Sequence, residues 1–161
     1  SRKLYTLSIE VTGEGTVTKN PDKLEYTHGE EVQLTAIPDE GWSFANWTGD
    51  LSGSDNPKVI VMDQNRSVSA TFIINTYTIV ATAGPGGAIE PEGQIQINHG
   101  DDKEFIITPD NGYETADVIV DGVSVGAVSN YTFNNVVSDH TIEASFSLLE
   151  YTITVDRKSV V

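Results

Sequence analysis

Two tryptophans in the first third of the chain are the side chains best suited to contact a ligand. Trp42 and Trp47 lie with Phe44 in a segment bounded by glycines, and exposed tryptophan faces are the surfaces on which proteins stack sugar rings. In a module this small, however, large aromatic side chains usually fill the core, and we favour core packing over ligand stacking. If strand alternation turns Trp42 and Phe44 inward, Trp47 has the opposite parity and is predicted to be exposed. Trp47, Trp42 and the nearby Asp50 are therefore the candidate ligand-binding residues.

Oxygen-bearing side chains gather in two loops, residues 49–56 and the pair Asp101 and Asp102. Carboxylate and hydroxyl oxygens are the hard ligands that calcium takes in proteins. Neither loop has the spacing of a recognised calcium site, and Asp, Asn, Ser and Gly are also the residues from which turns are built. We interpret both loops as turns, keep calcium as the alternative, and predict no other cofactor or metal.

Residues that could catalyse a reaction are present, but their spacing is not that of a catalytic centre. His28 and His99 each precede a glycine at matching turns, and no Glu or His lies at the helical spacing of a hydrolytic zinc site. The chain has no cysteine and no Gly-x-Ser-x-Gly nucleophile elbow. Chance pairs of carboxylates are expected among 24 acidic residues, so they are a poor basis for a glycosidase. We predict that the chain is not an enzyme.

The charge balance narrows the range of partners. The chain of 161 residues carries 9 basic and 24 acidic residues, a net charge of −15, which disfavours binding to a phosphate backbone or to anionic lipid. No stretch approaches the roughly 20 apolar residues of a membrane span. We therefore expect neither nucleic acid binding nor membrane insertion.

Internal repetition is the strongest signal in the sequence, and it sets the number of domains. The opening Tyr5-Thr6-Leu7 recurs as Tyr77-Thr78-Ile79 and again as Tyr151-Thr152-Ile153. The pair His28-Gly29 matches His99-Gly100, and the closing run 68–72 matches 142–146. The repetition predicts a first module over 1–74, a second over 75–148, and the start of a truncated third over 149–161. Neighbouring repeats of the same chain are expected to be partners of each module.

Alternation with a period of two, which is typical of half-buried strands, runs through the matched segments. Val32, Leu34 and Ala36 alternate with polar or exposed positions, and turn-forming residues interrupt the pattern at short intervals. The Asp121-Gly122 pair between two apolar triplets predicts a two-residue hairpin turn with positive φ angles. The expected fold class is all-β, with two small antiparallel modules that are either β-grasp-like or small sandwiches.

The run 41–50, Gly-Trp-Ser-Phe-Ala-Asn-Trp-Thr-Gly-Asp, together with Asn56-Pro57 and the closing 68–72, resembles the divergent internalin-type B repeats of bacterial surface proteins. The second copy resembles a sister form of that repeat, with 118–122 and 139–142 in matching order. The resemblance implies an extracellular or cell-surface location and supplies no catalytic residue. The second copy lacks the tryptophans of the first, so a ligand role for them would not extend to both modules.

Two functions of different classes follow. In the first, the modules are a spacer or adhesion segment of a surface or secreted bacterial protein, with a surface protein or polysaccharide as partner. In the second, the first module is a carbohydrate-binding accessory module of a secreted polysaccharide-degrading enzyme, with Trp47 at the contact. The asymmetry of the tryptophans favours the first, because paired binding modules gain avidity only when both carry the site.

Overall fold

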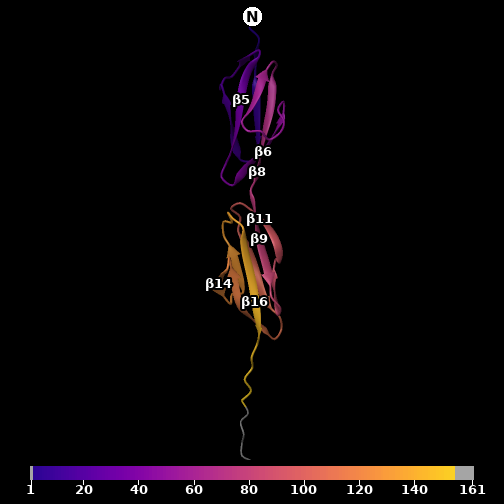
Figure 1. The fold of residues 1–161 in the computed structure, drawn as a ribbon, viewed down its shortest axis with the longest axis vertical. Helices are drawn as coiled ribbons and strands as arrows, with labels where there is room; N and C mark the ends of the chain where they lie inside the picture. Colours follow the sequence, from indigo (N-terminus) through magenta and orange to yellow (C-terminus); the bar gives the residue numbers. More distant parts are fainter. Residues whose placement is uncertain (1, 155–161) are drawn as a thin grey trace, which may run out of the picture. The chain divides into compact units, whose positions relative to one another are not determined.

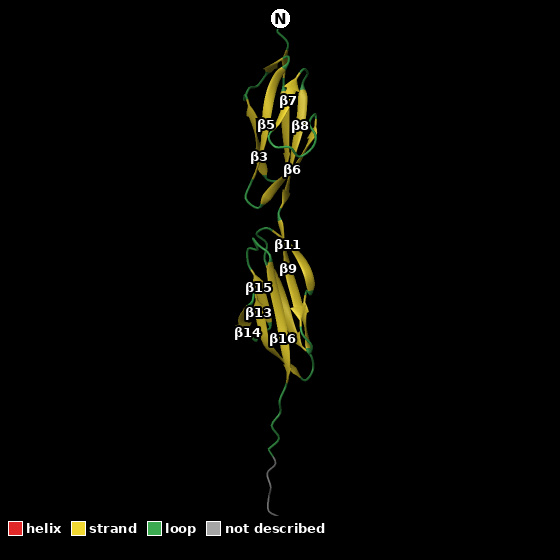
Figure 2. Ribbon diagram, in the orientation of Figure 1, coloured by secondary structure: helices red, strands yellow, loops and turns green. Residues whose placement is uncertain are grey.

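The computed structural model describes residues 2–154 and builds them from strands and turns, with no helix in that range (Figure 2). The prediction of an all-β chain is confirmed. The strands divide into two compact units, one ending at Thr76 and the other beginning at Tyr77, with the short segment Asn98–Gly100 grouped with the first. We call residues 2–76 the first repeat and residues 77–150 the second repeat.

The first repeat is a sandwich of two three-stranded sheets, β2-β8-β6 and β3-β5-β7, with a short additional pair β1-β4. Its strands are β1 (Leu4–Tyr5), β2 (Leu7–Thr12), β3 (Gly15–Asn20), β4 (Tyr26–Thr27), β5 (Glu30–Pro38), β6 (Trp42–Gly49), β7 (Lys58–Met62) and β8 (Arg66–Ile74).

The second repeat is a sandwich of the five-stranded sheet β11-β9-β16-β13-β14 and the three-stranded sheet β10-β12-β15. Its strands are β9 (Thr76–Ala83), β10 (Gly87–Glu90), β11 (Gly93–Asn98), β12 (Lys103–Pro109), β13 (Tyr113–Val120), β14 (Val123–Gly126), β15 (Asn130–Phe133) and β16 (His140–Leu148).

Each repeat has its own apolar core, to which both of its sheets contribute. In the first repeat the alternating Val32, Leu34 and Ala36 of β5 are buried against Val68 and Ala70 of β8. Complete burial of a Val, Leu or Phe side chain stabilises a fold by roughly 1.5–3 kcal/mol. The period-two pattern of the sequence therefore reports the inward faces of the strands. Because the described residues contain no helix to cross a sheet, the architecture is the sandwich rather than the β-grasp.

One strand pair in each repeat is parallel, which the alternation pattern does not reveal. Strand β2 pairs with β8 from Leu7↔Arg66 to Thr12↔Thr71. Strand β9 pairs with β16 from Ile79↔His140 to Ala83↔Ala144, and the two lie side by side in Figure 1. In both repeats these are the first long strand and the last strand. The antiparallel arrangement that we expected holds for the other registered pairs. Side chains alternate in the same way in either direction, so the sequence pattern could not distinguish them.

The predicted hairpin at Asp121-Gly122 is confirmed. Val120 pairs with Val123 across a two-residue turn, and φ is 49° at Asp121 and 80° at Gly122. Positive φ at both central residues defines the turn type whose twist matches that of the flanking strands.

The start of the predicted third repeat, 149–161, falls partly outside the described residues. Residues 151–154 are exposed and form no strand. Tyr151 and Ile153 keep 79% and 84% of their surface accessible, so the apolar positions of this segment have no core to enter in the described structure.

Candidate functional site

Trp47, the predicted ligand contact, is buried. Only 1% of its surface is exposed, and its indole Nε1–H donates a 2.8 Å hydrogen bond to the backbone oxygen of Asp55. The backbone of Trp47 also bridges to Gly53, so the loop after β6 closes over the ring. Its ring lies 4.9 Å from that of Phe44. The expectation of an exposed Trp47 is wrong, and the ring has no free face on which a sugar could stack.

A β-bulge at Ala45 is the reason. Phe44 pairs with Phe72 and Asn46 with Thr71, so Ala45 is an extra residue in β6. An extra residue inverts the alternation beyond it, and Phe44 and Trp47 both face the core despite their odd spacing. The second repeat has the same bulge at Ala116, and Val118, the counterpart of Trp47, is fully buried.

Trp42 is half-buried and packs against the core of the first repeat. A Cβ added to Gly13 would lie 3.0 Å from Cζ3 of Trp42, so the indole covers this glycine of the first turn. In the second repeat a Cβ on Gly86 would lie 2.3 Å from Cδ1 of Tyr113. The aromatic residue at this position therefore packs on a turn glycine in both repeats, and Trp42 keeps part of its surface accessible.

Asp50 fixes the start of the last strand. Its Oδ2 accepts a 2.7 Å hydrogen bond from the N–H of Ser67, the N–H of Asp50 donates to the oxygen of Ser67, and Arg66 lies 3.6 Å away. In the second repeat Asp121 does the same for Thr141, at 2.8 Å, with His140 as the neighbouring base. Asp50 and Asp121 each follow the matching strand directly, so their position in the repeat is the sequence signal for this role.

The pKa of the Asp121 carboxyl follows from these contacts. Burial opposes its ionisation, but the hydrogen bonds from the N–H of Thr141 and from His140 outweigh burial and lower the pKa. Asp121 is therefore held in its charged form, in which it accepts both bonds.

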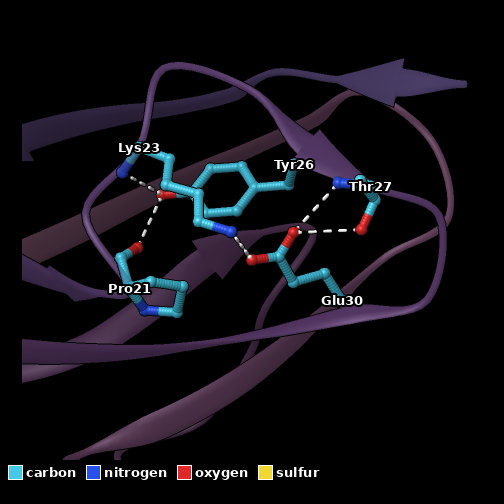
Figure 3. Close-up of polar contacts among 5 residues, drawn as sticks. All are labelled: Pro21, Lys23, Tyr26, Thr27 and Glu30. Atoms are coloured by element: carbon cyan, nitrogen blue, oxygen red, sulfur yellow. Dashed lines mark hydrogen bonds and ion pairs between the residues drawn. The ribbon is translucent and has the colours of Figure 1, made fainter. Parts of the chain in front are cut away.

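A polar network beside β4 holds the segment that connects β3 to β5 in the first repeat (Figure 3). The hydroxyl of the buried Tyr26 donates to the oxygen of Pro21 at 3.0 Å and accepts from the N–H of Lys23 at 3.3 Å. Glu30 forms an ion pair with Lys23 and accepts from the N–H of Thr27 at 3.0 Å. Its hydrogen bond with Lys23 is the main cause of a lowered Glu30 pKa, and the N–H of Thr27 adds to it. These contacts join the five residues to one another, so we assign the network a structural role.

The predicted metal and histidine candidates are also part of local structure. Asp102 accepts a 2.8 Å hydrogen bond from the N–H of Asn135, and the oxygen of Asp101 accepts one from Val136. His28 lies 3.4 Å from the hydroxyl of Tyr5. Within residues 2–154, no three or more His, Asp or Glu side chains are grouped so that they could hold a metal ion.

Two shallow hollows lie on the outer face of the five-stranded sheet in the second repeat. The larger, of about 390 Å³, is lined by Thr82, Ala83, Gly84, Ile119, Glu143, Ala144 and Ser145. The smaller, of about 220 Å³, is lined by Thr78, Val80, Asp121, Asp139, His140 and Thr141. Neither lining contains a Trp, Tyr or Phe side chain on which a sugar ring could stack.

The feature that both repeats share is the capped pair of parallel strands. Where β2 begins, the N–H of Thr6 donates to Oδ1 of Asn65 at 3.0 Å, and the N–H of Arg66 donates to the oxygen of Thr6. Just before the stretch of β9 that pairs with β16, the N–H of Thr78 donates to Oδ1 of Asp139 at 2.8 Å. Sequence reasoning missed these caps, although Asn65 and Asp139 both precede the matching last strand by one residue.

The fold and this shared feature define the chain as a tandem array of β-sandwich repeats. The family model of the divergent InlB B-repeat domain matches the chain twice, over residues 5–76 and 77–150. The chain therefore belongs to the divergent InlB B-repeat family, as its motifs indicated. No curated protein matches it. No helix in the described residues is long and apolar enough to cross a membrane.

Proposed function

We propose that the two repeats are a non-catalytic spacer and adhesion segment of a cell-surface or secreted bacterial protein, with a surface protein or polysaccharide as partner. The observation that carries the proposal is the parallel pairing of the first and last long strands in each repeat. Because these strands start together and end together, the chain enters each repeat at one end and leaves it at the other. Each folded repeat therefore advances the chain by a fixed length.

That length follows from strand geometry. Strand β8 contains nine residues, and at about 3.3 Å per residue it spans roughly 30 Å. A flexible linker with as many residues as one repeat reaches farther on average, but it samples a broad range of distances and exposes its backbone to proteases. The advantage of a folded spacer is therefore a defined reach and resistance to cleavage.

The point where the chain leaves is anchored in the same way in both repeats. The N–H of Asn75 donates to the oxygen of Gly41, and the N–H of Leu149 donates to the oxygen of Gly112, at 2.8 and 2.9 Å. Oδ1 of Asn75 also accepts a hydrogen bond from the hydroxyl of Ser43. A serial array needs such anchored ends, because a frayed end would make the reach of each module variable.

Family membership and the composition support an extracellular, non-catalytic role. The contacts described for the predicted functional side chains stabilise the fold. The chain is also strongly acidic, with a net charge of −15, which suits a solvated segment. The carbohydrate-binding alternative has less support, since Trp47 is buried and only Trp42 keeps a partly accessible ring.

A display experiment tests the proposal. A reporter domain is anchored to a bacterial surface either through residues 2–154 or through a Gly/Ser linker of equal length, and the cells are treated with protease. We expect the reporter to remain accessible and attached with the repeats and to be released from the linker. Release of the reporter at the same rate from both would contradict the spacer role.

A polysaccharide array distinguishes the spacer and adhesion role from the carbohydrate-binding alternative. The spacer and adhesion role requires no glycan contact through Trp42, so any glycan binding by the wild-type chain should survive Trp42→Ala. Glycan binding that is lost in Trp42→Ala and kept in Tyr113→Ala would establish the carbohydrate-binding role instead.

A further inference from the structure

We infer that the parallel strand pair of each repeat is a mechanical clamp that keeps the repeat folded when the chain is pulled at its ends. The inference deepens the proposed function and rests on it for its biological setting, since a surface spacer that joins an anchor to a bound partner carries any force between them.

The direction of the strands decides how such a force acts. Tension pulls β2 toward its start at Leu7 and pulls β8 toward its end at Ile74. Since the two strands are parallel neighbours, these pulls are opposed along the strand axis, and the bonds between the strands are loaded together. In an antiparallel terminal pair both pulls would act at one end and open the bonds one after another. The same geometry holds for β9 and β16 in the second repeat.

Caps at both ends extend the clamp beyond the strand ladder. At the start, Thr6 is held by Asn65 and Arg66, and Thr78 is held by Asp139. At the far end of the second pair, the N–H of Gly84 donates to the oxygen of Ala144 at 2.8 Å. Hydrogen bonds to an ionised acceptor are roughly twice as strong as neutral ones, so Asp139 makes a stronger cap than Asn65.

The two clamps differ in their protection from water. Strand β2 is an edge strand, and Leu7 and Ile9 are only half-buried. Strand β9 lies between β11 and β16, and both Ile79 and Ala81 are fully buried. Water competes for the hydrogen bonds of an edge strand, so its bonds open more readily. We therefore expect the second repeat to resist a higher force than the first.

Single-molecule force spectroscopy on the full chain tests the inference. The chain has no cysteine, so paired cysteine substitutions give unique handles. Handles at Thr76→Cys and Glu150→Cys load the second clamp along its strands (the 76/150 geometry). Handles at Pro85→Cys and Glu150→Cys pull both strands from one end and open the pair stepwise (85/150). Handles at Lys3→Cys and Thr76→Cys load the first clamp (3/76).

We expect the unfolding force to be several-fold higher in the 76/150 geometry than in the 85/150 geometry. We also expect a lower unfolding force for 3/76 than for 76/150. Equal forces for 76/150 and 85/150 would overturn the clamp, and equal forces for the two repeats would overturn the difference in protection.

A matched pair of variants tests the cap in the 76/150 geometry. Asp139→Ala and Asp102→Ala each remove one carboxylate that accepts a 2.8 Å backbone hydrogen bond, but only Asp139 acts within the clamp. We expect Asp139→Ala to lower the unfolding force clearly and Asp102→Ala to leave it nearly unchanged. An equal effect of the two would show that Asp139 contributes to general stability alone.

The two proposals fail separately. Low force resistance together with a protease-resistant reporter would overturn the clamp and leave the spacer role intact. High force resistance together with rapid release of the reporter would overturn the spacer role and leave the clamp as a property of the fold.

Discussion

Oδ2 of Asp121 lies 2.7 Å from Nδ1 of His140, at the position in the second repeat where Asp50 and Arg66 lie 3.6 Å apart in the first. In both repeats the carboxylate also accepts the N–H of the residue after its basic partner. The arrangement ties the end of one strand to the start of the last strand. The carboxylate recurs in both repeats while its basic partner changes from Arg66 to His140. The structural role therefore belongs to the carboxylate rather than to the base.

The lowered pKa of Asp121 predicts an acid-sensitive second repeat. A carboxyl whose pKa is lower in the folded than in the unfolded state adds stability above its unfolded pKa and loses it as pH falls through the folded pKa. We expect the melting temperature of the second repeat to fall as pH drops below the ordinary aspartate pKa. Asp121→Asn should be less stable at neutral pH and show a shallower acid dependence. An acid dependence identical to that of wild type, measured by calorimetry, would rule out Asp121 as a contributor.

Trp47→Ala should destabilise the first repeat severely. The substitution leaves a large cavity and removes the hydrogen bond to Asp55, and loss of a buried tryptophan typically costs about 3–5 kcal/mol. Trp42→Ala is the matched control, because its ring is only half-buried and should cost clearly less. Chemical denaturation followed by circular dichroism measures both. A smaller loss for Trp47→Ala than for Trp42→Ala would contradict the buried placement of Trp47.

Gly13→Ala should cost more than Gly29→Ala, although both glycines have φ near +80°. The left-handed conformation alone costs an alanine about 1–2 kcal/mol. At Gly13 the added Cβ would also lie 2.3 Å from the backbone oxygen of Phe72, whereas nothing lies within 4 Å of one at Gly29. We expect a destabilisation of about 3 kcal/mol or more for Gly13→Ala. Equal free energies of unfolding for the two variants would argue against close packing of the first turn on β8.

Removal of the Asp139 cap should expose the amide of Thr78, which directly precedes the part of β9 that pairs with β16. In Asp139→Ala the N–H of Thr78 loses its acceptor, and we expect its hydrogen exchange to accelerate by about tenfold or more, which corresponds to the roughly 1.5–3 kcal/mol of a hydrogen bond to a charged group. Exchange at Ile107, whose N–H donates to Ser129, should change far less. Unchanged protection at Thr78 would mean that the Asp139 contact is absent in solution.

The sequence was sufficient for the features that depend on local pattern. Matched motifs predicted the repeats, alternation predicted inward residues such as Val32 and Leu34, and Asp121-Gly122 predicted its hairpin. Two features of the structure could not be predicted from the alternation of apolar and polar residues. The bulge at Ala45 changes which face Trp47 occupies, and the direction of β8 relative to β2 sets where the chain leaves.

Both missed features left weak signals in the sequence. Phe44 and Trp47 are large aromatics at a spacing that regular alternation cannot bury on one face, and Ala116 repeats the small residue Ala45 in the second copy. A bulge at a small residue resolves that conflict. The direction of the last strand has no comparable signal, because it depends on the path of the loop between β6 and β7.

The distance between the two ends of one repeat tests the central claim most directly. Leu4 and Ile73 are both exposed residues of the first repeat, and the absence of native cysteine allows spin labels at Leu4→Cys and Ile73→Cys. With β2 and β8 parallel, the two positions should be about 30 Å apart in a narrow distribution measured by pulsed electron spin resonance. A separation below about 15 Å would place both ends of the repeat at the same side and contradict the spacer account.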